Sequence, residues 1–400
     1  MLLFSVKQQK SAPLDNYPPR KIIERACKYI SIFVLIFALT LAGCDDSLIP
    51  DENLNGGNPG NKVPVNPGPN LPIDTHWYTK NPNASTFYIS TAGELAELAQ
   101  IVNRTHDTIR PFSNFEGKTI SLSADINLSD YGKDSNGGKG WIPIGYFSTN
   151  TSFRGTFRGA GRKIIGLYID NGQQYTGLFG YIDGGSVENL GIIDADIKGA
   201  GNTGGIVGGI ANDGTVRNCY ITGNVTGSGN NVGGIVGSVV NGGAISNCYS
   251  TGNVTGTSQN VGGIAGNITN CTVSNCYVTG AVSGTVRTGG VTGYNNSSTV
   301  QNCAALNPSV KGSGFTGRVS GEGGTFTNNC AFTNMGTAGG VSFSSGNGVN
   351  HINGADITIQ AIAADGTIGG RFISANGWTA QNGRLPGFFG GTVELPAHLQ

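Results

Sequence analysis

The sequence has few charged side chains. Of its 400 residues, 24 are Lys or Arg and 24 are Asp or Glu, so only 12 % of the chain is charged and the formal net charge is zero. Nucleic-acid binding requires clustered Lys and Arg, and no such cluster occurs beyond residue 44, so we expect no nucleic-acid partner. Hydrophobic residues still reach 38 %, which excludes disorder caused by high charge.

Groups for catalysis are scarcest between Thr203 and Cys330. The charged residues of this stretch are Asp213, Arg217, Arg287, Lys311, Arg318 and Glu322. Two carboxylates are too few for the acid/base pair or the acidic, calcium-binding wall of a polysaccharide-cleaving enzyme. The histidines, His76, His106, His351 and His398, lie outside the stretch, and the chain has no H-E-x-x-H or G-x-S-x-G motif. We therefore expect no catalytic residues, no enzyme activity, no metal and no cofactor.

What the stretch does contain is a repeat. An Asn-Cys pair recurs in steps of 29, 28, 27 and 27 residues, at Asn218-Cys219, Asn247-Cys248, Asn275-Cys276, Asn302-Cys303 and Asn329-Cys330. A Gly-x-x-Gly element keeps the same period, at Gly177–Gly180, Gly205–Gly208, Gly234–Gly237, Gly263–Gly266 and Gly290–Gly293. A fixed period in this range indicates a stacked array of repeats.

Each repeat favours strands over helices. Three short β-favouring pieces, such as G-I-V-G and I-S-N-C-Y-S, are separated by Gly, Asn, Ser and Thr, and none could propagate a helix. Gly and Asn supply the positive-φ corners of a coiling chain, and stacking at strand spacing pairs each strand with the next repeat. The sequence predicts an all-β fold: a right-handed parallel β-helix over residues 176–330, with one coil of about 27 to 29 residues per repeat.

Alternation along each strand assigns an inward and an outward column. If the Asn of each pair lies at a corner, the Cys that follows it points inward. The five Asn-Cys pairs are then predicted to form a structural ladder of stacked residues, in which the cysteines are reduced thiols. The next residue then points outward, which predicts a solvent-facing aromatic row and a candidate binding face at Tyr220, Tyr249 and Tyr277. Cys271 lies outside the column and is either a free surface thiol or bridged to a neighbouring coil.

These repeats resemble proteins carrying the GLUG motif, named for Gly-Leu-hydrophobic-Gly, which stands here at Gly177-Leu178-Phe179-Gly180. The resemblance covers the repeats and, more loosely, the segment from Phe87 to Asp183. It implies a module of bacterial surface proteins, of which some are adhesive and some are attached to peptidases. It does not imply a particular ligand.

The N-terminus predicts a lipoprotein signal peptide over residues 1–43. A basic region, Arg20 to Lys28, precedes an apolar stretch, Ile30 to Ala42, that is too short to span a bilayer comfortably. Leu41-Ala42-Gly43-Cys44 resembles a bacterial lipobox, which implies that Cys44 carries lipid and anchors the protein in the outer membrane. Asp45 and Asp46 resemble the export signal of Bacteroidetes surface lipoproteins and imply display on the cell exterior, with periplasmic display as the alternative.

The segments around the coils predict a stalk and two caps. Residues 44–74 form a stalk with six Pro between Pro50 and Pro72. In the N-terminal cap and early irregular coils, residues 75–175, a capping-box spacing from Thr91 to Glu94 predicts a helix that covers the open end. Residues 331–400 are expected to form irregular C-terminal coils that seal the last coil, with a binding site there as the alternative.

The polar loop Asp130 to Gly140 could indicate a calcium site, because Asp130, Asp134 and Asn136 could supply oxygen ligands. The loop lacks the spacing of an EF-hand, and we interpret it as a surface loop.

These observations favour a non-enzymatic surface lipoprotein that adheres to, or binds, a host or microbial glycan or protein. One alternative is a polysaccharide-processing or glycan-capturing accessory protein, with active groups between Asp125 and Arg162. Another is a structural spacer of the cell envelope.

Overall fold

The computed structural model describes residues 76–105, 112–148, 150–336, 343 and 346–400. The expected signal peptide, Cys44, Asp45, Asp46, the stalk and His106 lie outside these residues. The chain divides into two compact units, residues 1–61 and 62–400, and everything described belongs to the second. None of the helices described is long and apolar enough to cross a membrane.

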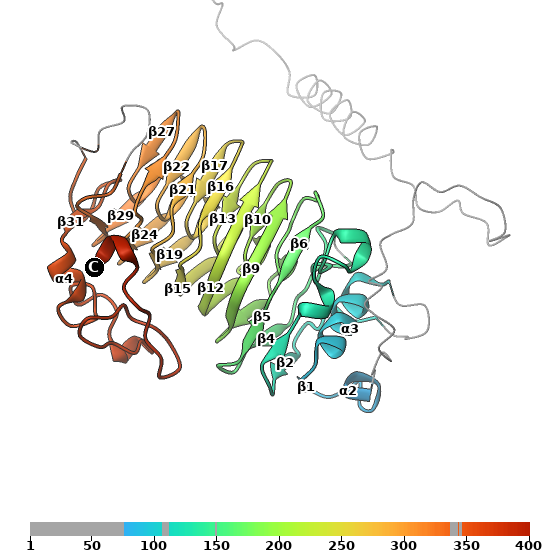
Figure 1. Cartoon of the computed structure of the whole chain (residues 1–400). Helices are drawn as coiled ribbons and strands as arrows, with labels where there is room; N and C mark the ends of the chain where they lie inside the picture. Colours follow the sequence, from blue (N-terminus) through green and yellow to red (C-terminus); the bar gives the residue numbers. More distant parts are fainter. Residues whose placement is uncertain (1–75, 106–111, 149, 337–342, 344–345) are drawn as a thin grey trace, which may run out of the picture. The chain divides into compact units, whose positions relative to one another are not determined.

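The second unit is a parallel β-helix, which confirms the predicted fold class (Figure 1). The first sheet comprises β1 (Thr86–Ile89), β2 (Thr119–Leu122), β3 (Ile126–Asn127), β4 (Thr156–Arg158), β5 (Lys163–Ile165), β6 (Tyr168–Asp170), β8 (Ser186–Glu188), β9 (Gly191–Gly199), β12 (Thr215–Gly227), β15 (Ala244–Ser250), β16 (Val254–Gly256), β19 (Thr272–Ser274), β20 (Tyr277–Val278), β21 (Val282–Ser283), β24 (Thr299–Gln301), β25 (Ala304–Ala305), β26 (Val310–Lys311), β29 (Thr325–Thr327), β30 (Cys330–Phe332) and β31 (Ala355–Ile357).

Two smaller sheets complete the regular coils. The second sheet comprises β7 (Phe179–Asp183), β11 (Val207–Ala211), β14 (Val236–Val240), β18 (Ala265–Thr269), β23 (Thr292–Asn296) and β28 (Ser320–Glu322). The third comprises β10 (Thr203–Gly204), β13 (Val232–Gly233), β17 (Asn260–Gly262), β22 (Arg287–Gly289) and β27 (Phe315–Gly317). Strands of successive coils pair in parallel and in register, for example Cys219 with Cys248 and Tyr220 with Tyr249.

Asn residues form the corners of the coils. Asn218, Asn247, Asn275 and Asn302 have φ of 53°, 51°, 52° and 53°, a left-handed conformation that Asn adopts at lower cost than most residues. The Asn218 amide donates to Asn189 Oδ1 at 3.0 Å, and the Asn247 amide donates to Asn218 Oδ1 at 3.1 Å. Sequence period and backbone corner therefore coincide in all four coils, whereas the amide ladder ends at Asn247, whose Oδ1 accepts no hydrogen bond from another described residue.

The interior is a stack of identical or similar apolar residues. Cys219, Cys248, Cys276 and Cys303 are fully buried, and all cysteines in the described residues are free thiols. Burial raises the pKa of the Cys219 and Cys276 thiols well above the ordinary value, so both stay protonated. Cys271 is a free thiol, which confirms that part of the first alternative and excludes the bridge, but it is buried rather than at the surface.

In the last regular coil the predicted column slips by one residue. Asn328, rather than Asn329, takes the left-handed corner, with φ of 53°, and its amide donates to Asn302 Oδ1 at 2.8 Å. Asn329 therefore occupies the inward position, where its Nδ2 donates to Val300 O at 2.8 Å. Cys330 pairs with Ala304 on the outward column instead of continuing the Cys column. The ladder assignment of Asn329 and Cys330 is wrong because a one-residue slip exchanges the faces of a strand.

One inward column ends on a polar side chain. In the second sheet, register places Ile182, Ile210, Val239, Ile268 and Asn295 in line. Asn295 is buried, and neither its Oδ1 nor its Nδ2 has a hydrogen-bond partner among the described residues. Such an amide loses its hydration without compensation, which costs stability.

The helix over the N-terminal end is α3 (Ala92–Asn103), which follows α2 (His76–Thr79). Thr91 Oγ1 accepts from Glu94 N and Glu94 Oε2 accepts from Thr91 N, so the predicted capping box is present. Its side chains Leu95, Leu98 and Ile101 are buried in the common core, as expected of a cap.

The C-terminal residues follow two different paths. Strand β31 pairs with β30 and extends the stack, and Arg318 is held against this turn by the carbonyl oxygens of Asn353 and Gly354 and by Asp356. After α4 (Ile359–Ala363), residues 372–400, which we call the C-terminal segment, instead return along the side of the first sheet and include η3 (Ser374–Asn376) and η4 (Ala397–Leu399). The expectation that these residues only seal the last coil is therefore corrected.

Candidate functional site

The tyrosine row does not face solvent. Tyr220, Tyr249 and Tyr277 stack with ring centroids 4.8 and 4.9 Å apart, on the face opposite the cysteines, but they are only 8 %, 5 % and 0 % exposed. Trp378 and Phe388 of the C-terminal segment cover the rings, with centroids 6.2 and 5.8 Å from that of Tyr249. The prediction that these tyrosines form an exposed binding face is therefore wrong.

Aromatic chemistry explains why this face is covered. Three stacked rings on a solvent-facing sheet would form a continuous apolar patch, and soluble proteins usually bury or use such patches. The Phe372 ring meets that of Tyr277 edge-on at 5.5 Å, and Tyr277 Oη donates to Pro386 O at 2.7 Å. The segment thus provides both apolar contact and a hydrogen-bond partner for the buried hydroxyl.

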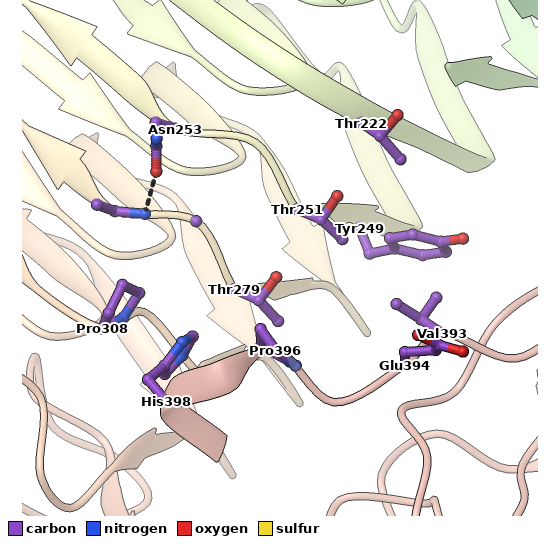
Figure 2. A pocket seen from close by; sticks show the side chains of 12 residues that line it. Thr222, Tyr249, Thr251, Asn253, Thr279, Pro308, Val393, Glu394, Pro396 and His398 are labelled. Atoms are coloured by element: carbon purple, nitrogen blue, oxygen red, sulfur yellow. Dashed lines mark hydrogen bonds between the residues drawn. The ribbon is translucent and has the colours of Figure 1, made fainter. Parts of the chain in front are cut away.

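A pocket of about 420 Å³ opens beside the covered rings, between the first sheet and the C-terminal segment (Figure 2). The coils contribute one wall and the segment the other. Its lining consists of Thr222, Tyr249, Thr251, Asn253, Thr279, Gly280, Ala281, Pro308, Val393, Glu394, Pro396 and His398. A volume of this size is typical of small-ligand sites.

Threonines from three successive coils line the first wall. Thr222, Thr251 and Thr279 each follow the paired positions Ile221, Ser250 and Val278. Thr222 Oγ1 accepts from Asp194 N at 3.0 Å, whereas the hydroxyls of Thr251 and Thr279 have no hydrogen-bond partner among the described residues. The wall therefore presents hydroxyls at strand spacing, roughly 4.8 Å apart.

A glycine after each threonine allows this wall to form. A Cβ on Gly252 would lie 1.4 Å from Gly223 O, so the coils approach too closely here for any side chain. Close packing of the Thr-Gly steps brings the hydroxyls of neighbouring coils to the same surface. The sequence contains this signal, as Thr222-Gly223, Thr251-Gly252 and Thr279-Gly280, but sequence reasoning did not single it out.

Asn253 adds an amide to the same wall. Its backbone N donates to Asn224 Oδ1 at 3.2 Å, and its own Oδ1 accepts from Ala281 N at 2.9 Å, the dashed line of Figure 2. Asn253 is thus held by the coils on both sides and is still exposed to solvent. Its Nδ2 makes no hydrogen bond to another described residue and is available to a ligand.

The C-terminal segment supplies the ionisable groups. Val393 is held by reciprocal backbone hydrogen bonds with Leu385, of 2.8 and 2.9 Å, and this pairing places Glu394 at the pocket. The Glu394 side chain is 84 % exposed and lies 3.6 Å from Arg384. His398 Nε2 lies 2.8 Å from Leu306 O, so this imidazole also ties the segment to the coils.

The pocket is built for hydrogen bonding. Its lining holds one carboxylate, Glu394, and one imidazole, His398, together with threonine hydroxyls and an amide. A pair of carboxylates flanking a glycosidic bond, as most glycosidases use, is not among the lining residues. The arrangement suits recognition of a ligand that is rich in hydroxyl groups.

In the early coils, which are the alternative location for active groups, several charged side chains form hydrogen bonds or ion pairs with a neighbouring coil. Asp125 Oδ1 accepts from Lys163 N at 2.8 Å, and Arg154 pairs with Asp183. Glu188, only 2 % exposed, lies between Arg158, at 2.7 Å, and Arg217, with which it is in register. A buried carboxylate needs such pairing. Sequence reasoning missed this triad because its members lie about 30 residues apart.

The polar loop forms short helical turns, η1 (Ser129–Tyr131) and η2 (Asn136–Gly138). In the part of the chain that the structure describes, no group of three or more His, Cys, Asp or Glu side chains could hold a metal ion.

Comparison with known proteins supports the repeat architecture. The GLUG motif matches residues 199–226, 228–255 and 257–283, so this chain carries GLUG repeats. Over 136 residues, 34 % of the chain, it is 35 % identical to halomucin of Haloquadratum walsbyi, of whose length this match covers 1 %. A crystal structure of a candidate immunoglobulin A1 protease from Bacteroides ovatus is similar, with a TM-score of 0.54, 19 % identity, and coverage of 76 % of this chain and 93 % of that one. At this identity the structural likeness shows the fold alone.

Proposed function

We propose that this protein is a non-enzymatic surface lipoprotein that binds a glycan in the pocket between the threonine wall and the C-terminal segment. The observation that carries the proposal is the pair of unpartnered hydroxyls, on Thr251 and Thr279, that face the same pocket as Asn253 and Glu394. Sugar hydroxyls both donate and accept hydrogen bonds, and this set of groups offers both kinds of partner.

The ring of Tyr249 adds an apolar contact to these polar groups. Ligand pockets commonly combine apolar walls with a few polar groups that fix orientation. The name of the protease-like structural neighbour does not lead us to propose proteolysis, because the pocket lining contains neither Ser nor Cys as a nucleophile beside His398.

Lipid attachment at Cys44 is the second part of the proposal. The lipobox-like sequence before Cys44 supports anchoring in the outer membrane, and Asp45 and Asp46 support display on the exterior. We expect Cys44→Ala to abolish incorporation of labelled palmitate; continued labelling would contradict the anchor. We expect Ala at both aspartates to protect the protein from protease added to whole cells, and unchanged cleavage would contradict the export signal.

A glycan array tests the pocket. The compact unit of residues 62–400 is compared with its Thr251→Val/Thr279→Val variant, which keeps the shape of both side chains and removes both hydroxyls. Loss of two hydrogen bonds of about 1 kcal/mol each weakens binding more than tenfold. Thr255→Val, at an exposed position on the same coil outside the pocket, is the matched control and should bind normally. Equal glycan binding by the double variant would contradict the proposal.

A further inference from the structure

An aromatic cluster lies at the first coils of the second sheet, away from the pocket residues. Phe147 is 63 % exposed and stacks on Tyr175, with centroids 5.0 Å apart and planes 13° apart. Tyr181 meets both rings edge-on, at 4.9 and 5.3 Å. The three rings form one unit, in which the buried Tyr181 and the half-buried Tyr175 support the exposed ring of Phe147. An exposed aromatic ring held in this way is typical of a ligand-contacting surface.

Tyr175 is held in a conformation that its residue type disfavours. Its φ is 58°, and it occupies the position that Asn202 and Asn231 take in the next two coils. Those asparagines form a second amide ladder, in which Asn231 donates to Asn202 at 2.7 Å and Asn260 donates to Asn231 at 2.6 Å. A left-handed backbone costs a bulky residue on the order of 1 kcal/mol or more, so Tyr is present here against the conformational preference.

The neighbouring coil leaves room for these rings. A Cβ on Gly209 would lie 2.8 Å from Tyr175 Cδ1 and 2.9 Å from Tyr181 Cδ2, so both rings rest on this glycine. The hydroxyls of Tyr175 and Tyr181 make no hydrogen bond to another described residue. Burial raises the pKa of Tyr181 to about 12, and the hydroxyl therefore remains a neutral donor at physiological pH.

The cluster begins a row of outward-facing residues, which we call the outer row. Strand register places Tyr181, Gly209, Ser238, Asn267 and Tyr294 in line across five successive coils. Asn267 Nδ2 donates to Ser238 Oγ at 3.1 Å, so the middle of the row is small and polar. At roughly 4.8 Å per coil, the two tyrosines are about 19 Å apart.

The far end of the row is aromatic as well. Arg287 lies over the Tyr294 ring, 4.5 Å from its centroid, and pairs with Glu322. Arg287 and Glu322 thus neutralise each other, and the row positions between the two tyrosines, Gly209, Ser238 and Asn267, carry no charge. A charged ligand would therefore find no counter-charge in this row, and an uncharged ligand needs none.

We propose that the outer row, with Phe147 and Tyr175, is a second binding surface, which takes a neutral polysaccharide chain lying along the solenoid. The apolar face of a sugar ring stacks on the exposed ring of Phe147, which Tyr175 supports from below, and the sugar hydroxyls bond to Ser238, Asn267 and the tyrosine hydroxyls. The length of the row suits several linked sugars. This inference rests on the proposed function, because it extends glycan binding to a second site and names the class of glycan.

The test measures retardation of the full chain, in detergent, in gels that contain neutral β-glucan or xylan, or anionic polygalacturonate. Phe147→Ala removes an exposed ring, and Tyr175→Asn replaces the strained residue by the one that the next coils use. We expect both variants to lose about tenfold or more in affinity for a neutral polysaccharide, which corresponds to about 1.4 kcal/mol. Tyr175→Asn should keep or raise the melting temperature, which separates lost binding from lost folding.

Phe315→Ala, at a ring 58 % exposed on the third sheet, is the matched control and should bind like the wild type. Thr251→Val/Thr279→Val alters the pocket alone, so the retardation that remains in this variant measures the share of the outer row. Absence of retardation in neutral gels, stronger retardation by polygalacturonate, or unchanged binding by Phe147→Ala and Tyr175→Asn would each overturn the inference. Loss of all retardation in the threonine variant would also overturn it, while leaving glycan binding by the pocket intact.

Discussion

The cysteine and tyrosine columns occupy adjacent positions on the same strands, yet they are buried by different means. Cys248 is enclosed by the coils themselves, because its neighbours in the column are one repeat away. Tyr277, by contrast, is buried by residues about a hundred positions later, with its hydroxyl bonded to Pro386. A repeat therefore determines its interior locally, whereas its outer face depends on a segment that does not share the repeat.

The largest effect should follow from a charge in the inner column. Cys248→Asp buries a carboxylate among packed neighbours with no counter-charge, at a cost of several kcal/mol. We expect a large fall in melting temperature by circular dichroism. Thr255→Asp, exposed on the same coil, is the control and should melt near the wild type; comparable melting of the two variants would show that Cys248 is not enclosed.

The tyrosine column should contribute less to the stability of the coils than the cysteine column does, and mainly to the attachment of the C-terminal segment. Tyr249→Ala removes a ring between Tyr220, Tyr277 and the covering aromatics, which costs about 3 kcal/mol. We expect early proteolysis within residues 372–400 and intact coils. Tyr88→Ala, at a ring 63 % exposed, should leave cleavage unchanged. If Tyr249→Ala behaves like that control, the covering contact is absent in solution.

High pH should weaken the same contact. Burial raises the pKa of the Tyr249 and Tyr277 hydroxyls above the ordinary value of 10.0, so the folded state holds protons that the unfolded chain has released. Their contribution to stability is complete below pH 10 and decreases as pH rises above it. Tyrosinate absorbance should report a late, cooperative transition, which the Tyr249→Phe/Tyr277→Phe variant lacks; ordinary titration of both tyrosines near pH 10 would contradict their burial.

The smallest expected effect is a gain in stability at Asn295. Asn295→Val continues the apolar column of Val239 and Ile268 and removes an amide without partners, which should stabilise the fold by about 1 kcal/mol. Urea unfolding measures the gain. Asn267→Val, which removes the outward amide bonded to Ser238, should give none. Destabilisation by Asn295→Val would show that its amide is satisfied.

These differences also explain what the sequence could predict. Periodic Asn-Cys and Gly-x-x-Gly positions predict the coils and their inward columns, and the spacing of Thr91 and Glu94 predicts α3, because both signals are local. The corner of the last regular coil could be either of two consecutive asparagines, Asn328 and Asn329, and the prediction from the repeat period named Asn329, whereas Asn328 is the corner. The cover over the tyrosines and the pocket beside it depend on irregular residues 372–400, whose place no repeat determines.

The central claim is that the C-terminal segment packs on the tyrosine row and completes the pocket. Hydrogen exchange of the wild type and Trp378→Ala tests it most directly, because Trp378 contacts both Tyr249 and Tyr277. We predict that the variant exchanges faster across residues 372–400 while the amides of residues 203–330 stay protected. Unchanged protection of the segment, or equal loss of protection throughout the coils, would contradict the claim.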